Sequence, residues 1–177
     1  MGKATTNIIY SQKFFDVEER NFLLPHGINK KYSIVHRRPI SVIFPLEDDK
    51  NLYLILQYRH LFGKRILEAP AGHIDNGETS LDGAKRELRE ETGLEARSWK
   101  KIIEYDSSGS VIESHVSIFL ARNLKRGTAL PEDYEDIKLI KISLEEAVKK
   151  VMSGEISTSS TIIGLLLLDK AYKENKL

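Results

Sequence analysis

Cysteine is absent from this chain of 177 residues. The absence rules out disulfides, thiolate zinc sites and a cysteine nucleophile. A strong charge of one sign is also missing, because a formal net charge of +1 gives no general affinity for nucleic acid or for an anionic membrane. The longest apolar run, at 162–168, is far too short to span a bilayer, and no run of signal-peptide length opens the sequence. These absences favour a cytoplasmic protein that partners neither nucleic acid nor membrane.

No repeat, low-complexity tract or Pro/Gly-rich linker divides the sequence, so its length predicts one domain, residues 1–177. The composition, 41% hydrophobic and 30% charged, is an ordinary globular balance. Strands are predicted where β-branched and aromatic residues gather, namely two within 7–25 and one each at 32–38, 40–46, 52–58, 100–106, 115–121 and 137–142. The polar tract 47–51 predicts a turn, and hence a hairpin, between the two strands that flank it.

Two helices are predicted near the C-terminal end of the sequence. Ser143 is a suitable N-cap for a helix over 143–154, which a glycine ends. The apolar segment 160–174 predicts a second helix, capped by Ser159 or Ser160. Strands and helices together predict an α/β (α+β) fold in which a mixed sheet carries helices on its faces.

The stretch GHIDNGETSLDGAKRELREETGL, residues 72–94, crowds acidic residues between two glycines. Thr79 or Ser80 is suited to cap a helix within it, and Gly93 is suited to end that helix. One apolar stripe, which must face the core, is formed at about 100° per residue by Leu81, Ala84 and Leu88. The stretch therefore predicts an amphipathic helix preceded by a loop that contains glycine.

Three glutamates of this helix raise a question of charge. Glu87 and Glu91 lie one turn apart on the shoulder of the apolar stripe, and Glu90 lies about 60° further round from Glu87. Like charges at this spacing repel, and half-buried carboxylates need a cation, yet the pattern puts no lysine or arginine on that shoulder. Hard carboxylate oxygens suit Mg²⁺ or Mn²⁺. Spacing alone leaves two interpretations open, a divalent-metal site and a solvated glutamate face.

Taken whole, the stretch has the form G-x5-E-x7-R-E-L-x-E-E-x-G-L and resembles the Nudix box. Every defined position is filled, by Gly72, Glu78, Arg86, Glu87, Leu88, Glu90, Glu91, Gly93 and Leu94. The resemblance implies an α/β/α sandwich with a mixed sheet. It also implies metal-dependent hydrolysis of a nucleoside diphosphate linked to another group.

The resemblance to the Nudix box also implies a role for individual residues. The divalent metal would be bound by the side chains of Glu87, Glu90 and Glu91 and by the backbone carbonyl of Ala71. Glu78 and Arg86 would brace the loop, beside the structural glycines Gly72 and Gly93.

The flanking sequence is similar to that of ADP-ribose pyrophosphatases within this superfamily. Residues 57–78 resemble the QYR…E-x-PAG…GE stretch of that subfamily. Residues 107–114 resemble its SPG-x-x-x-E, with Ser108 in place of the proline. This resemblance implies hydrolysis of ADP-ribose, a nucleoside diphosphate sugar, to AMP and ribose 5-phosphate with Mg²⁺, or with Mn²⁺ in its place.

Two flanking residues acquire substrate-binding roles from the same resemblance. Arg59 would bind the phosphates of the substrate, and Glu113 would lie near the diphosphate. An ion pair of Arg59 with Glu68 and an exposed loop position for Glu113 are the alternatives. The nucleobase leaves no motif, although Phe14, Phe15 and Tyr58 are candidates to stack on it.

The segment 1–36 is similar to the N-terminal strands of the same subfamily. An antiparallel strand extension ahead of the sandwich is therefore implied. In that subfamily these strands cross to a partner subunit, so the resemblance implies a homodimer in which 1–36 is the dimerisation segment. The many apolar side chains of residues 7–35 fit this assignment.

The general base is assigned, again by resemblance, to the acidic loop at 131–139. Glu135 is in register with the glutamate that activates water in that family, whereas Lys138 replaces the next acid. The acidity has moved upstream, to Glu132, Asp133 and Asp136. We expect Glu135 to be the base, with Glu132 and Asp133 as the reserves and Glu91 as the catalytic carboxylate of the helix.

Three other interpretations compete with ADP-ribose hydrolysis. The first is hydrolysis of a GDP-sugar, a dinucleoside polyphosphate or an oxidised nucleotide on the same fold. The second is a non-catalytic nucleotide-sugar sensor, which the intact box disfavours because such sensors tend to lose box carboxylates. The third, the isomerase branch of the superfamily, is disfavoured because its chemistry uses a cysteine and the chain has none.

Overall fold

The computed structural model describes residues 6–127 and 136–176. In chain order its elements are β1 (Thr6–Ser11), β2 (Phe15–Leu23), η1 (Pro25–Gly27), β3 (Asn29–Arg37), β4 (Ile40–Pro45), β5 (Asn51–Arg59), η2 (His60–Phe62), β6 (Lys64–Glu68), β7 (Ala71–His73), α1 (Ser80–Thr92), β8 (Leu94–Asp106), β9 (Ile112–Glu113), β10 (His115–Arg126), β11 (Ile137–Ser143), α2 (Leu144–Met152) and α3 (Ser159–Lys173). No helix within these residues is long and apolar enough to cross a membrane.

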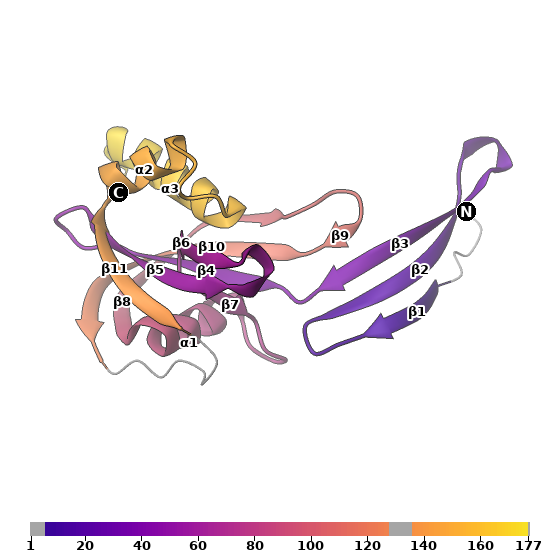
Figure 1. The fold of residues 1–177 in the computed structure, drawn as a ribbon, viewed down its shortest axis with the longest axis horizontal. Helices are drawn as coiled ribbons and strands as arrows, with labels where there is room; N and C mark the ends of the chain where they lie inside the picture. The colour runs from indigo at the N-terminus through magenta and orange to yellow at the C-terminus, as the bar shows by residue number, and fades with distance from the viewer. Residues whose placement is uncertain (1–5, 128–135, 177) are drawn as a thin grey trace.

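The body of the molecule is a sandwich of sheets between helices. One sheet has the order β7-β4-β10-β8 and is mixed, because β4 and β10 run parallel while the other neighbours run antiparallel. The second sheet, β11-β5-β6, is antiparallel. Figure 1 shows α2 and α3 on one side of these sheets and α1 on the other. The predicted α/β/α sandwich with a mixed sheet is confirmed.

The predicted hairpin between the strands that flank 47–51 is wrong. A single antiparallel bridge, between Leu46 and Leu52, connects the ends of the two strands. The strands β4 and β5 themselves belong to different sheets. Each strand is bonded along both edges, β4 by β7 and β10 and β5 by β6 and β11, so neither has a free edge for the other. Both strands are almost continuously buried, a pattern that suits central strands and contains no information about the choice of neighbour.

Two apolar clusters fill the sandwich. The larger lies under α2 and α3, and the ring of Phe44 packs there so closely on Gly164 that an added Cβ would collide with it. The smaller lies under α1 and contains Ile43, Leu88 and Phe119. Because β4 contributes to both clusters, α1 and the helices on the opposite face are fixed relative to each other.

Helix caps follow the sequence with one exception. Ser143 caps α2 by accepting a hydrogen bond from the backbone N–H of Glu146 at 3.1 Å, as predicted. The N-cap position of α3 is Thr158, so the assignment of Ser159 or Ser160 as its cap is wrong. The backbone of Thr158 is still extended, whereas Ser159 is already helical. Thr158 donates from its hydroxyl to that of Thr161 at 2.8 Å.

The N-terminal strands form a third sheet, in the order β1-β2-β3-β9, which extends away from the sandwich (Figure 1). The strands β1, β2 and β3 are antiparallel neighbours, which confirms the predicted extension, and short β9 adds in parallel to β3. Large apolar side chains remain about half exposed on it, including those of Ile8, Ile9, Tyr10 and Leu23. This sheet therefore lacks a packed apolar layer within the described chain.

Candidate active site

The acidic stretch forms the loop and helix that its sequence predicts. Thr79 caps α1 by accepting a hydrogen bond from the backbone N–H of Asp82 at 3.1 Å. Gly93 ends the helix in the left-handed conformation, with φ of 66°, and donates to Arg89. Ala84 and Leu88 are fully buried under the helix, as the stripe requires. One shoulder of α1 therefore faces β7, the strand that precedes it.

Arg86 is the centre of the ionic network on this shoulder. Its Nε and Nη2 donate to the two carboxylate oxygens of Glu78, at 2.9 and 3.0 Å. Its Nη1 donates to Glu87 at 2.7 Å and to Glu90 at 3.1 Å. Its Nη2 also donates to the carbonyl of His73 at 2.8 Å. The guanidinium thus joins the loop, the end of β7 and two helix carboxylates, as a planar fork of donors can.

This network corrects the expectation that no arginine serves the shoulder. Arg86 projects from the neighbouring helix position, but its long side chain reaches back between Glu87 and Glu90. Hydrogen bonding to Glu78 is the main cause that raises the pKa of Arg86 and lowers the pKa of Glu78. The crowded glutamates consequently do not require a metal ion to offset their repulsion, so charge crowding alone is no argument for one.

Glu91 occupies a different environment from Glu87 and Glu90. Its carboxylate is buried, 6% exposed, and accepts a hydrogen bond from the backbone N–H of Ala71 at 2.9 Å. The next residue, Gly72, lies so close to Glu87 that an added Cβ would collide with its carboxyl group. Glycine is required here for close approach of the strand to the helix. Two helix carboxylates are therefore held directly against β7.

The donor set suits a hard divalent cation in its chemistry. Oxygen ligands are available from the carboxylates of Glu87, Glu90 and Glu91 and from backbone carbonyls near Ala71. Beside them, the backbone of Gly72 has no room for a Cβ atom. In the part of the chain that the structure describes, however, no three acidic or histidine side chains converge on a common point. Arg86 engages two of the three glutamates, so ligation of an ion requires these side chains to rearrange.

The family model of the NUDIX domain matches residues 35–158. The chain belongs to the Nudix hydrolase family. Nudix hydrolases use divalent metal ions, in agreement with the oxygen-rich donor set on α1.

Relatives of this Nudix hydrolase span most of its length. It is 31% identical over 173 residues to an ADP-ribose pyrophosphatase of Bacillus subtilis, covering 95% of this chain and 93% of the relative. It is 30% identical over 166 residues to an ADP-ribose pyrophosphatase of Mycobacterium tuberculosis, covering 92% and 80%. A methanol dehydrogenase activator of Bacillus methanolicus is 29% identical over 173 residues, covering 95% and 93%.

The fold of the hydrolase is also that of a solved structure described as an ADP compounds hydrolase. The TM-score is 0.85, and the match covers 100% of this chain and 98% of the other. At 21% sequence identity this likeness concerns the fold alone.

Arg59, predicted to bind phosphate, lies at the end of β5 and donates from Nε to Glu68 at 2.6 Å. The ion pair that the sequence left as an alternative is therefore present. This ion pair uses the Nε–H of the guanidinium, and the N–H groups of Nη1 and Nη2 are further donors. The arginine is partly exposed while Glu68 is buried, which leaves the head group accessible from one side.

Glu113, predicted to lie near the diphosphate, is an exposed residue of β9 whose carboxylate accepts from Nδ1 of His36. His36 also contacts buried Glu18 through Nε2 at 2.6 Å, and Arg20 donates to Glu18 from Nη2 at 2.7 Å. No sequence pattern indicated this network, because its members come from β2, β3 and β9. Glu113 belongs to the N-terminal sheet, outside the ionic network of Arg86.

The remaining sequence assignments concern the acidic loop. Glu132, Asp133 and Glu135 lie outside the described residues. Asp136 follows them and is paired with Arg65 of β6 through its carboxylate. That ion pair shows that one member of the acidic group is bound to β6.

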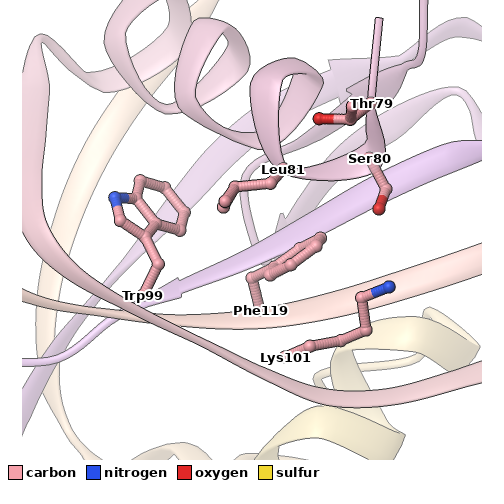
Figure 2. A pocket seen from close by; sticks show the side chains of 6 residues that line it. All are labelled: Thr79, Ser80, Leu81, Trp99, Lys101 and Phe119. Carbon is pink, nitrogen blue, oxygen red and sulfur yellow. The ribbon is translucent and has the colours of Figure 1, made fainter.

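A hollow of about 270 Å³ lies beside the N-terminal end of α1, where Figure 2 shows Leu81, Trp99 and Phe119 lining it. Its other lining residues are Thr79, Ser80 and Lys101. None of the box glutamates lines it. The hollow is therefore separate from the shoulder of α1 that carries Arg86 and the carboxylates.

Proposed function

We propose that this Nudix hydrolase cleaves the diphosphate of ADP-ribose to AMP and ribose 5-phosphate in a reaction that depends on Mg²⁺. The observation that carries the proposal is the complete box, held by Arg86 with its carboxylates against β7, in a chain whose ADP-ribose pyrophosphatase relatives match over almost its whole length. Mn²⁺ would serve in place of Mg²⁺, because both prefer oxygen ligands.

Glu87, Glu90, Glu91 and the carbonyl of Ala71 would hold the metal. When bound, a divalent ion offsets the charge of the diphosphate and lowers the pKa of a bound water. Arg86 would then keep Glu78 and the loop in place. Arg59 would bind a phosphate with the donors that Glu68 leaves available, and Glu113 would contact the substrate from β9.

Substrate identity is tested by incubating the purified protein with Mg²⁺ and a panel of ADP-ribose, GDP-mannose, a diadenosine polyphosphate and a nucleoside triphosphate. We expect ADP-ribose to give AMP and ribose 5-phosphate with the highest kcat/KM. The Glu91→Gln variant, purified in the same way, controls for a contaminating enzyme. Turnover of another panel member about a hundredfold faster, a difference of about 2.7 kcal/mol, would overturn the substrate assignment.

Water activation needs a proton acceptor that is not bound to the metal, and Glu135 is our choice, with Glu132 in reserve. Replacing Glu135 by glutamine should lower kcat and leave substrate affinity nearly unchanged, since it removes an acceptor rather than a ligand. Raising the pH should partly restore the rate. Asp136→Asn is the matched control, because Asp136 is paired with Arg65. A silent Glu135→Gln beside an impaired Glu132→Gln would move the role to Glu132.

We further propose a single-domain chain that forms a homodimer through segment 1–36. The half-exposed apolar side chains of β1, Ile8 and Ile9 among them, support this assembly. Sedimentation at micromolar concentration should give a dimer, which Ile8→Arg should dissociate. Leu61→Arg is the control, because Leu61 is 88% exposed and lies outside that segment. A monomeric and fully active wild-type protein would refute the proposal.

A cytoplasmic location stays a prediction from the sequence.

A further inference from the structure

The N-terminal sheet meets the sandwich at the turn between β1 and β2, where Phe14 stacks on His73. The two ring centroids are 4.5 Å apart and the ring planes make an angle of 18°. Phe14 comes from the extension, whereas His73 is the last residue of β7 and follows Gly72 within the Nudix box. This stack therefore connects the extension directly to the segment that touches the box carboxylates.

Backbone hydrogen bonds fix both sides of the stack to the same short connection between β3 and β4. The N–H of Arg38 donates to the carbonyl of Phe14 at 3.0 Å. The carbonyl of the next residue, Pro39, accepts from the N–H of Ile74 at 2.9 Å. The turn of the extension and the start of the Nudix loop thus share one anchoring segment, and the two rings close the junction.

The His73 ring is held by packing rather than by a hydrogen bond at Nε2. That atom is buried and has no hydrogen-bond partner in the described part of the chain. Burial, together with the positive charges of Arg37 and Arg38, lowers the pKa of His73 to about 4. The stack on Phe14 is therefore a packing contact between two aromatic rings.

Each residue of β7 touches a different residue of α1. Ala71 donates its N–H to Glu91, Gly72 leaves no room for a Cβ beside Glu87, and the carbonyl of His73 accepts from Arg86. A shift of His73 therefore moves the contacts of all three helix side chains together. A contact that holds His73 also sets the position of β7 relative to the carboxylates.

We propose that Phe14 is a positioning residue for the Nudix box: by stacking on His73 it holds β7 against Glu87 and Glu91. The extension then acts on the active centre of its own chain, in addition to any part in assembly. The kinetic part of the test rests on the proposed hydrolysis of ADP-ribose. The exchange part does not.

Amide hydrogen exchange of peptides covering 71–78 tests the positioning directly, with no substrate present. Phe14→Ala should accelerate exchange there, because the amides of Ala71 and Ile74 lose their fixed acceptors. Phe15→Ala is the matched control. Phe15 is the adjacent phenylalanine and is equally exposed, at 36%, but its ring packs on Tyr10. Phe14→Trp keeps an aromatic face and should restore slow exchange. Equal exchange in the Phe14→Ala and Phe15→Ala proteins would overturn the proposal.

Steady-state kinetics separate positioning from a general loss of folding. Phe14→Ala should lower kcat by about fivefold and change KM by less than about twofold, because the shifted groups act on the reacting centre. His73→Ala should have the same effect, and the double variant should be no worse than either single one. His73→Phe should retain activity. Additive effects in the double variant would refute the coupling, and Phe14→Leu provides the same test if Phe14→Ala does not fold. If the enzyme does not hydrolyse ADP-ribose, the exchange result still decides the question.

Discussion

Two ionic networks in this molecule have the same arrangement but different central residues. In the Nudix box, Arg86 lies between carboxylates of the loop and of α1. In the N-terminal sheet, His36 lies between Glu18 and Glu113. Both networks join elements that are adjacent in space. They differ in their central side chain, because an imidazole can lose its proton whereas a guanidinium keeps it.

Arg86 stays charged throughout the range in which a histidine titrates, and hydrogen bonds to its carboxylates, first to that of Glu78, raise its pKa further. The pKa of His36 is raised from its ordinary value. Burial alone would lower its pKa, but the hydrogen bonds to Glu18 and Glu113 raise it. The box is therefore tied permanently to its loop, whereas the tie between β3 and β9 depends on pH. The four predictions below test this difference, beginning with the largest expected effect.

The largest effect is expected at a box carboxylate. Glu91→Gln should lower turnover by at least about a hundredfold, which is about 2.7 kcal/mol of transition-state stabilisation. Glu113→Gln, which alters the other network, should lower it by less than about tenfold, or about 1.4 kcal/mol. Steady-state kinetics with saturating metal measure both. Near-normal turnover of the Glu91→Gln enzyme would show that this face of α1 has no catalytic role. Equal losses would remove the distinction between the networks.

Arg86→Lys should destabilise the protein although it preserves the charge. Lysine cannot reproduce the fork that joins Glu78, Glu87 and Glu90, and the half-buried carboxylates lose donors at a cost of about 2 kcal/mol. Urea unfolding measures the loss. Arg20→Lys in the N-terminal sheet is the control and should lose less, because Arg20 bonds to a single carboxylate. The comparison fails if Arg20→Lys is the more harmful change.

Gly72→Ala should lower kcat by about tenfold, or about 1.4 kcal/mol, because the new methyl group displaces the carboxylate of Glu87. Gly109→Ala provides the control, since an added Cβ there meets open space. Gly109 lies in the loop before β9. Kinetics and the urea midpoint should be measured together. A Gly72→Ala protein with wild-type kcat would show that the close approach has no functional importance.

The smallest effect is expected from pH and concerns His36. Its pKa is raised in the folded protein, so its contribution to stability is complete below its unfolded value of about 6.5 and is lost as pH rises through the raised value. The urea midpoint of the wild type should therefore exceed that of His36→Asn by more at about pH 6 than at about pH 9. A difference that grows with pH would reverse the assignment.

The acid side of the same network has the opposite sign. The hydrogen bond from Arg20 is the main reason that the pKa of Glu18 is lowered to about 2. Its contribution is therefore present above about pH 4.5 and is lost as pH falls towards 2. The network in the N-terminal sheet is thus complete only between the lowered pKa of Glu18 and the raised pKa of His36. Arg86, in contrast, keeps its charge as the pH rises through this range.

Local features of the fold were predictable where a residue type acts on its immediate neighbours. Thr79 and Gly93 bound α1 because a hydroxyl caps nearby N–H groups and glycine adopts positive φ. Ser143 bounds α2 for the same reason. The stripe that contains Ala84 and Leu88 is buried because helical periodicity places it on one face. These effects extend over a few residues and can therefore be read from sequence.

The neighbours of a strand could not be predicted in the same way. The sequence of 40–58 indicates two apolar strands around a turn, and a hairpin is the simplest result. The hairpin does not form because both edges of each strand pair with other strands: β4 pairs with β7 and β10, and β5 pairs with β6 and β11. Similarly, no spacing indicates that Phe14 meets His73 or that His36 joins Glu18 to Glu113. Such contacts depend on how whole sheets are placed.

The bracing pair of Glu78 and Arg86 was implied by the resemblance to the Nudix box, whereas the sequence by itself determined the helices and most strands. These depend on side-chain chemistry at fixed short spacings. Only the tertiary structure decided that Arg86 neutralises Glu87 and Glu90, that Glu91 is buried against Ala71, and that Arg59 is paired with Glu68. The physical reason is that long side chains and backbone groups from separate strands meet within hydrogen-bond distance only after the sheets have packed.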